Sequence, residues 1–132
     1  MTFAARQTRW ARTLAATLVA SGIEEVVVSP GSRSTPLVLA LAAQPGLSLR
    51  VVLDERSAAF FALGRVRVTE RPAALVCTSG TAGTHYFPAV AEASRSRLPL
   101  VAITADRPPE LQERDAPQTI PQGQLFGRHV RL

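Results

Sequence analysis

The sequence has no lysine, one cysteine and few aromatic residues. All 15 basic side chains are arginines, which exceed the 10 acidic residues and give a formal net charge of +5. The single cysteine, Cys77, lies in an apolar run and cannot form an internal disulfide, so we expect a buried thiol in a reducing, cytoplasmic compartment. No run of 18 or more apolar residues occurs, which argues against an integral membrane segment.

Several motifs are also missing. The sequence has neither the glycine and lysine spacing of a phosphate-binding P-loop nor a GxGxxG pattern, which disfavours an NTPase or a dinucleotide enzyme. No pair of cysteines or histidines has metal-ligand spacing, so no metal site is expected from this chain. The arginines are scattered, so we expect no nucleic acid partner. Arginine also captures carboxylates and phosphates in bidentate fashion, which makes small anions the favoured ligands.

The sequence does contain a regular alternation of apolar runs and helical patterns. A length of 132 residues with 46% apolar residues suits about one globular domain. Short β-branched runs recur roughly every 25 residues, which is the rhythm of βαβ units. The fold class predicted is therefore α/β, an open parallel sheet with helices on both faces. The predicted strands are residues 26–28, 51–53, 73–77 and 100–104.

The segments between these strands predict helices. Trp10, Leu14 and Leu18 recur at helical spacing in the first of them, and Gly64 marks the end of the third. The predicted helices are residues 2–21, 36–45, 57–63 and 88–94. Residues 108–123 are rich in proline and glutamine and are expected to form a functional loop. Residues 126–132 resemble the start of another element, so we expect the domain to be incomplete on its C-terminal side.

Polar residues follow the carboxyl end of each predicted strand. These ends meet at one edge of a parallel sheet, where open α/β proteins bind ligands. The edge should therefore bring together Ser32, Arg33, Glu55, Ser79, Gly80 and Arg107.

Each of these turns has two interpretations. Residues 29–35 could bind an anion with Arg33 and backbone amides, or could be an ordinary capped turn. Gly80 could let a flat ligand approach the backbone closely, or could simply serve a strand-to-helix turn. Glu55 could take part in proton chemistry, or Asp54 and Glu55 could simply lie near a helix N-terminus, where negative charge is favourable.

Four motifs in order carry a resemblance to a known family. They are SPGSRSTPL (residues 29–37), LDERSAAFFALG (53–64), CTSGTA (77–82) and ITADRPPEL (103–111). Together with Gln118 and QLFG at residues 124–127, they resemble the N-terminal part of the MenD family. This family comprises the thiamine-diphosphate-dependent SEPHCHC synthases of menaquinone biosynthesis.

The resemblance implies a domain and a set of site residues. Residues 1–132 would form the N-terminal pyrimidine-binding (PYR) domain, incomplete, without the central and C-terminal diphosphate-binding domains. Glu55 would be catalytic, through a hydrogen bond to a ring nitrogen of the cofactor's aminopyrimidine. Thr78, Ser79 and Gly80 would also bind the cofactor. The substrate-binding residues would be Ser32, Arg33, Arg107 and Gln118.

The resemblance also implies a reaction and partners. The enzyme would decarboxylate 2-oxoglutarate and add the succinyl-semialdehyde carbanion to isochorismate. Thiamine diphosphate would be held with Mg²⁺ or Mn²⁺ by the absent C-terminal domain, in a homodimer or dimer of dimers that shares its active sites. The 132 residues alone would then be inactive. Residues 83–86, Gly-Thr-His-Tyr, depart from the family pattern and put the contacts at the start of that helix in question.

Two alternatives remain open from the sequence. One is another thiamine-diphosphate decarboxylase or carboligase, similar to acetolactate synthase, which shares the glutamate and the TSG turn. The other is a non-catalytic α/β module that binds an anionic metabolite at its arginines.

Overall fold

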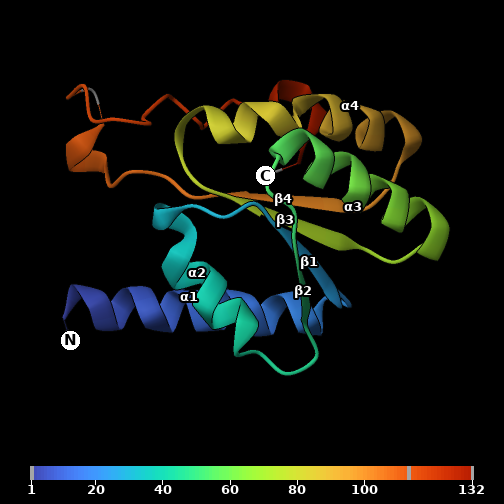
Figure 1. Ribbon diagram of the computed structural model, residues 1–132, viewed down its shortest axis with the longest axis horizontal. Helices are drawn as coiled ribbons and strands as arrows, with labels where there is room; N and C mark the ends of the chain where they lie inside the picture. Colours follow the sequence, from blue (N-terminus) through green and yellow to red (C-terminus); the bar gives the residue numbers. More distant parts are fainter. Residues whose placement is uncertain (1, 113, 132) are drawn as a thin grey trace.

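The computed structural model of the protein describes residues 2–112 and 114–131, and its centre is a parallel sheet of four strands (Figure 1). The strand order is β2-β1-β3-β4, and all three neighbouring pairs are parallel, so the carboxyl ends of the four strands lie along one edge of the sheet. The strands are β1 Glu25–Val28, β2 Ser48–Val51, β3 Ala73–Cys77 and β4 Leu100–Thr104. This parallel sheet confirms the predicted fold class.

Four helices cover the two faces of the sheet. The helices α1 Phe3–Ala20 and α2 Thr35–Ala42 pack together on one face, and α3 Glu55–Thr69 and α4 Phe87–Ser96 on the other (Figure 1). Short 3₁₀ helices lie at the carboxyl edge and in the C-terminal segment, at Ser32–Ser34, Gly80–Tyr86, Pro109–Leu111 and Gly127–His129.

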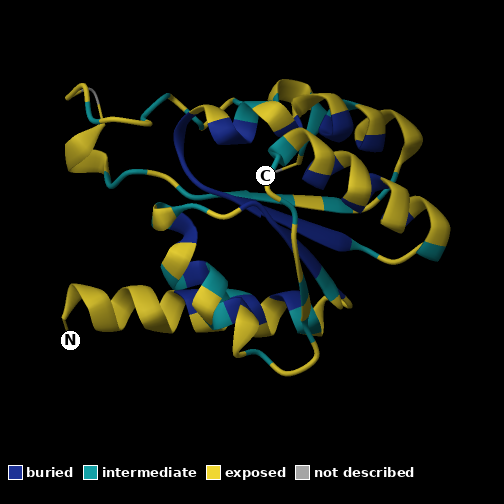
Figure 2. Cartoon of the chain, in the orientation of Figure 1, coloured by how far each residue is buried: buried dark blue, intermediate teal, exposed yellow. Residues whose placement is uncertain are grey.

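The two central strands supply the core of both layers. Successive side chains of a strand point to opposite faces. Val27 and Leu75 accordingly pack with α3 and α4, whereas Val26 and Val76 pack with α1 and α2. Figure 2 shows the resulting dark buried band along β1 and β3. The near-continuous apolar sequence of these strands thus reflects burial on both faces.

The second strand differs from its prediction. Residues 51–53 were expected to form a buried strand, but β2 spans Ser48–Val51 and lies at the edge of the sheet. Val51 is 63% exposed and Leu53 is 80% exposed, while Val52 packs against the core. The prediction was wrong because an apolar run in the sequence does not show whether its side chains lie in the core or are exposed at the edge of the sheet.

The third helix is longer than predicted. Gly64 was expected to close it, yet α3 continues to Thr69 and ends at Glu70, whose φ of 56° is left-handed. Glycine inside a helix costs only about 1 kcal/mol relative to alanine. Val66, two residues later, is completely buried, and that burial outweighs the cost of Gly64.

The first helix is confirmed, with a different buried stripe. Ala11, Ala15 and Leu18 pack into the core, whereas Trp10 is exposed. At the other end, the element expected over residues 126–132 is only the short 3₁₀ helix Gly127–His129, and Leu132 lies outside the described residues. No helix in the described ranges is long and apolar enough to cross a membrane.

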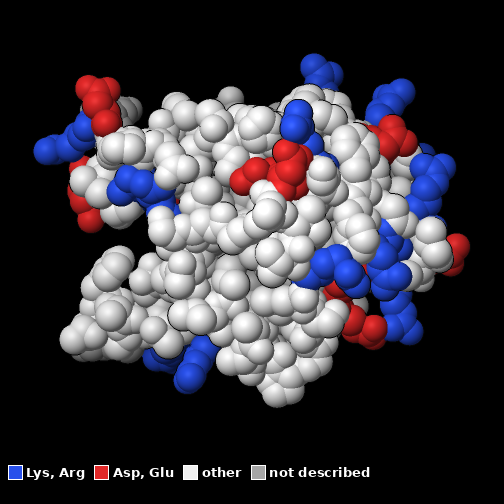
Figure 3. All heavy atoms as spheres, in the orientation of Figure 1, with Lys and Arg blue, Asp and Glu red and all other residues white. Residues whose placement is uncertain are grey.

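The charged side chains do not form a continuous basic face in the view of Figure 3, where blue clusters are separated by white and red atoms. Ion pairs account for several arginines near the amino ends of the strands. Glu25 accepts from both Arg50 and Arg65, and Glu24 pairs with Arg71. Hydrogen bonds from Arg65 and Arg50 outweigh the desolvation of Glu25 and hold its pKa below the usual range.

Candidate functional site

The sequence-predicted site residues all lie in or beside the connections at the carboxyl edge of the sheet. Five of them form one contiguous hydrogen-bonded network with the loop that follows β4. These five are Arg33, Ser79, Gly80, Arg107 and Gln118. Ser32 is exposed, and neither its side chain nor that of Glu55 hydrogen-bonds to another described residue. Residues 117–122 are called the strap below, because they cross this edge.

Two arginines converge on a single backbone carbonyl of the strap. Arg33 donates from Nη1 to Gln118 Oε1 at 2.6 Å and from Nη2 to the Pro117 carbonyl at 3.1 Å. Arg107 donates from Nη2 to the same carbonyl at 2.8 Å. The Nε atoms of both arginines are buried without a hydrogen-bond partner, and neither pairs with a carboxylate in the described part of the chain. Two like charges held together in this way attract an anion.

The turn after β3 holds the strap in place. Ser79 is buried and donates from Oγ to the Gln118 carbonyl at 2.7 Å. A Cβ on Gly80 would meet the Gln118 backbone carbonyl carbon at 2.9 Å, and Gly80 itself has a φ of 76°. The close approach predicted at Gly80 therefore occurs, but the group that approaches is the protein's own strap. Gln118 also has a left-handed φ, 56°, a strained backbone state that such contacts can maintain.

The turn after β1 packs directly against the turn after β3. A Cβ on Gly31 would collide with the Thr78 side chain at 2.4 Å, so glycine is required there for space. The Thr78 hydroxyl is buried without a hydrogen-bond partner among the described residues. This buried polar atom leaves unused hydrogen-bonding capacity at the edge, which suits a polar ligand.

One residue of the network was missed by the sequence analysis. Gln122 accepts from the Gly80 amide through Oε1 at 2.9 Å and donates from Nε2 to the Ala105 carbonyl at 2.9 Å. Its Nε2 also lies 3.3 Å from Thr104 Oγ1. Glutamine in a loop without periodicity gives no local signal of such contacts, so only the fold reveals them.

Glu55 occupies the first turn of α3, and its neighbour Asp54 serves the helix terminus. Asp54 accepts from the Ser57 amide at 3.0 Å as the N-cap. Hydrogen bonds from Arg56 and from that amide hold the pKa of Asp54 well below its usual range. Because Asp54 already fulfils the capping role, the partly buried Glu55 carboxylate is not needed as the cap, and it accepts no hydrogen bond from the part of the chain that the structure describes.

Two buried protic groups, at the end of β3 and at the end of the 3₁₀ helix that follows it, lie near enough to Glu55 to feel its charge. Cys77 and Tyr86 are fully buried, and the Tyr86 hydroxyl has no hydrogen-bond partner among the described residues. Burial, with a smaller Coulombic contribution from Glu55, raises the pKa of the Cys77 thiol to about 12 and raises that of Tyr86 still further above its usual range. Both groups therefore stay neutral at physiological pH. Tyr86 belongs to the segment flagged as a departure from the family pattern.

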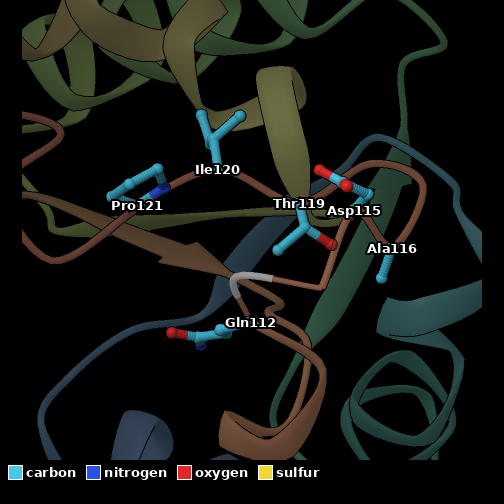
Figure 4. Close-up of a pocket in the computed structure, with 6 residues that line it drawn as sticks. All are labelled: Gln112, Asp115, Ala116, Thr119, Ile120 and Pro121. Carbon is cyan, nitrogen blue, oxygen red and sulfur yellow. The ribbon is translucent and has the colours of Figure 1, made fainter.

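Not all surface pockets are lined by residues of the hydrogen-bonded network described above. A pocket of about 250 Å³ lies within the loop itself, and no predicted site residue lines it (Figure 4). Its lining residues are Gln112, Asp115, Ala116, Thr119, Ile120 and Pro121. A second hollow of about 230 Å³, between α1 and the end of β4, is bordered by Arg33. Residues 2–112 and 114–131 contain no group of three His, Cys, Asp or Glu side chains that could hold a metal ion.

The sequence is closely similar to those of known proteins. Residues 8–125 match the family described as thiamine pyrophosphate enzyme, N-terminal TPP binding domain. The 2-succinyl-5-enolpyruvyl-6-hydroxy-3-cyclohexene-1-carboxylate synthase of Chloroflexus aurantiacus is 57% identical over 94% of this chain and 21% of its own length. The synthase of Geobacillus kaustophilus is 60% identical over 86% of the chain and 20% of its length. That of Halorubrum lacusprofundi is 56% identical over the whole chain and 21% of its length.

A solved structure shares the fold. The thiamine diphosphate-dependent 4-hydroxybenzoylformate decarboxylase of Rhodococcus jostii RHA1 matches 95% of this chain and 23% of its own, with a TM-score of 0.80 and 18% identity. The chain spans about a fifth of the length of the curated relatives it matches. The chain therefore belongs to the family of N-terminal TPP binding domains of thiamine pyrophosphate enzymes, and its resemblance to SEPHCHC synthases is confirmed.

Proposed function

We propose that this chain is the pyrimidine-binding domain of a SEPHCHC synthase, which forms its product from 2-oxoglutarate and isochorismate with loss of CO₂. The observation that carries the proposal is the pair Arg33 and Arg107, which meet at the Pro117 carbonyl beside the TSG turn and have no carboxylate partner among the described residues. Both substrates carry two carboxylates, and guanidinium groups bind carboxylates in bidentate fashion. The identity of more than half of the residues to named synthases supports the same activity.

The arginines, Ser32 and Gln118 are proposed to bind and orient the substrates. In the structure the strap supplies neutral oxygen acceptors to the guanidinium groups. A substrate carboxylate, being charged, makes stronger hydrogen bonds than these carbonyls and can recruit the unpaired Nε atoms. Ser32 is exposed and free to donate to the same ligand. Orientation of this kind is a large part of the catalytic effect in a two-substrate reaction.

The edge between Glu55 and the TSG turn fits the cofactor's pyrimidine. Among the described residues, the Glu55 carboxylate accepts no hydrogen bond, and the buried Thr78 hydroxyl has no hydrogen-bond partner. Thiamine diphosphate, when bound, supplies the centre that stabilises a carbanion. Glu55 is proposed to hold a proton between its carboxylate and a ring nitrogen of the aminopyrimidine. Thr78, Ser79 and Gly80 would lie against the ring, with the buried Ser79 and Gly80 fixed by the strap.

The rest of the enzyme is proposed to lie in segments beyond these residues. The central and diphosphate-binding domains, with Mg²⁺ or Mn²⁺, would complete the site from a partner subunit of a cytoplasmic homodimer or dimer of dimers. Supporting this is an apolar surface beside Glu55, formed by Val51, Leu53 and Phe60, which no described residue covers. The 132 residues alone would then be inactive.

The test uses the complete protein with thiamine diphosphate, Mg²⁺, 2-oxoglutarate and isochorismate. Product formation is compared between the wild type and Glu55→Gln, which removes the proton-binding carboxylate but keeps its shape. Loss of a group that takes part in proton transfer is expected to lower kcat by about 10²- to 10⁴-fold. The matched control is Glu70→Gln, because Glu70 is an exposed glutamate at the far end of the same helix.

Three outcomes would contradict the proposal. Unchanged activity in a folded Glu55→Gln protein would leave Glu55 with a helix-terminus role only. Carboligation of pyruvate in place of the two substrates would identify an acetolactate-synthase-like enzyme. No turnover of either substrate set by the wild type would indicate a non-catalytic anion-binding module.

A further inference from the structure

The strap is held to the rest of the domain by hydrogen bonds at both of its ends. At its start, Pro117 and Gln118 receive hydrogen bonds from Arg33 and Arg107. At its end, Gln122 reaches down into the edge of the sheet. The contacts at the start involve the arginines assigned above to substrate binding, together with Ser79 of the turn assigned to the cofactor. The contacts at the end involve Gly80 of that turn and Ala105 after β4.

Gln122 joins two neighbouring strands through both ends of one amide group. Its oxygen accepts from the Gly80 amide in the turn after β3, and its nitrogen donates to the Ala105 carbonyl just after β4. Only a side chain that donates and accepts at the same time can satisfy both main-chain groups. Both contacts are partly buried, so removing the amide would leave a backbone donor and a backbone acceptor unsatisfied.

The position of Gln122 also constrains Gln118. The Gln118 backbone lies against Gly80, because a Cβ on Gly80 would be 2.9 Å from the Gln118 carbonyl carbon. Gln118 also has a left-handed φ of 56°, which is unfavourable for a residue with a side chain. The Ser79 hydroxyl donates to the Gln118 carbonyl, and the Gln122 side chain accepts from the amide of Gly80 in the same turn. Without Gln122 the strained segment would relax, and the acceptors that align Arg33 and Arg107 would move with it.

We propose that Gln122 is a positioning residue that fixes the substrate-binding arginine pair relative to the cofactor turn by clamping the strap to Gly80 and Ala105. The inference rests on the proposed function for the identity of the two ligands. The clamp itself is a property of the described contacts and can be measured without turnover.

The experiment uses the complete protein and three variants. Gln122→Ala removes both contacts of the clamp, and Gln122→Glu keeps an acceptor for Gly80 but cannot donate to Ala105 when ionised. Gln124→Ala is the matched control, because Gln124 is an exposed glutamine of the same loop whose side chain makes no hydrogen bond to described residues. Steady-state kinetics with 2-oxoglutarate and isochorismate are combined with amide hydrogen exchange of peptides that contain Gly80 and the strap.

Gln122→Ala is expected to raise KM for isochorismate or 2-oxoglutarate by about ten-fold and to change kcat by less than about three-fold. Hydrogen exchange at Gly80 and in the strap should accelerate by about the same ten-fold. Gln122→Glu should show both effects, and Gln124→Ala neither. A general loss of folding would instead lower kcat and accelerate exchange throughout the sheet.

Two results would overturn the inference. One is unchanged exchange at Gly80 and in the strap of Gln122→Ala. The other is faster exchange there with KM for both substrates within about two-fold of wild type. If the wild type turns over neither substrate, the proposed function fails, and the exchange measurement still decides whether Gln122 clamps the strap.

Discussion

At the scale of single residues, Cys77 shows how position in the sheet controls reactivity. It ends a central strand and is completely buried. Desolvation raises the pKa of its thiol to about 12, so at pH 8 the group remains protonated and unreactive. We expect no iodoacetamide labelling of Cys77 in the native protein at pH 8 and complete labelling in urea, measured by peptide mass spectrometry. Labelling of the native protein at a rate close to that of a free thiol would contradict this burial.

The residues of the site divide into those visible from the sequence and one that was not. Arg33, Glu55, Gly80 and Arg107 follow predicted strands, and parallel topology alone brings such positions to one edge. Gln122 was missed because its contacts depend on a loop whose path no periodic pattern encodes. The role of Gly80 was predicted only in part. The sequence predicted that a group would approach the Gly80 backbone closely, but not that this group is the strap. The ligand-binding roles of these residues remain predictions.

At the scale of elements, the sequence predicted strands best where an apolar run of five residues lies between polar turns. The bounds of β3 and β4 agree with the prediction, because apolar runs between polar turns leave one choice of strand. The prediction failed at β2 and at the end of α3. In both places the outcome depends on tertiary packing, which covers Val66 but leaves Leu53 exposed.

The extension of α3 through Gly64 gives a prediction for helix stability. Gly64 has helical backbone geometry, and a Cβ there would meet no atom within 4 Å. Gly64→Ala should therefore raise the free energy of unfolding by about 0.5–1 kcal/mol, because alanine loses less conformational entropy. Urea unfolding of the 132-residue chain, followed by circular dichroism, measures the change.

Gly22→Ala is the matched control for this prediction. A Cβ on Gly22 also meets no atom within 4 Å, but its φ is 82°, a region that alanine rarely adopts. Gly22→Ala should therefore destabilise the chain. Equal effects of the two substitutions would show that backbone conformation does not decide the outcome.

At the scale of the whole molecule, the exposed apolar side chains near Glu55 are a feature that packing within the domain does not explain. Val51, Leu53 and Phe60 come from the edge strand β2, the turn after it and the start of α3. The run containing Val51 and Leu53 suggested a buried strand from sequence, yet both side chains are exposed in this chain. We propose that a partner subunit packs against these three side chains.

Leu53→Asp tests this proposal. Leu53 is 80% exposed, so a charge there should leave the fold of the domain intact but would be buried without a partner in a dimer interface. We expect the complete protein to dissociate at micromolar concentration, with its mass falling to that of a monomer in sedimentation velocity, and to lose turnover in parallel. The control is Val68→Asp, because Val68 is 82% exposed near the other end of α3 and away from Glu55. A Leu53→Asp protein with wild-type mass and activity would place the subunit interface elsewhere, and dissociation of both variants would remove the specific role of the surface beside Glu55.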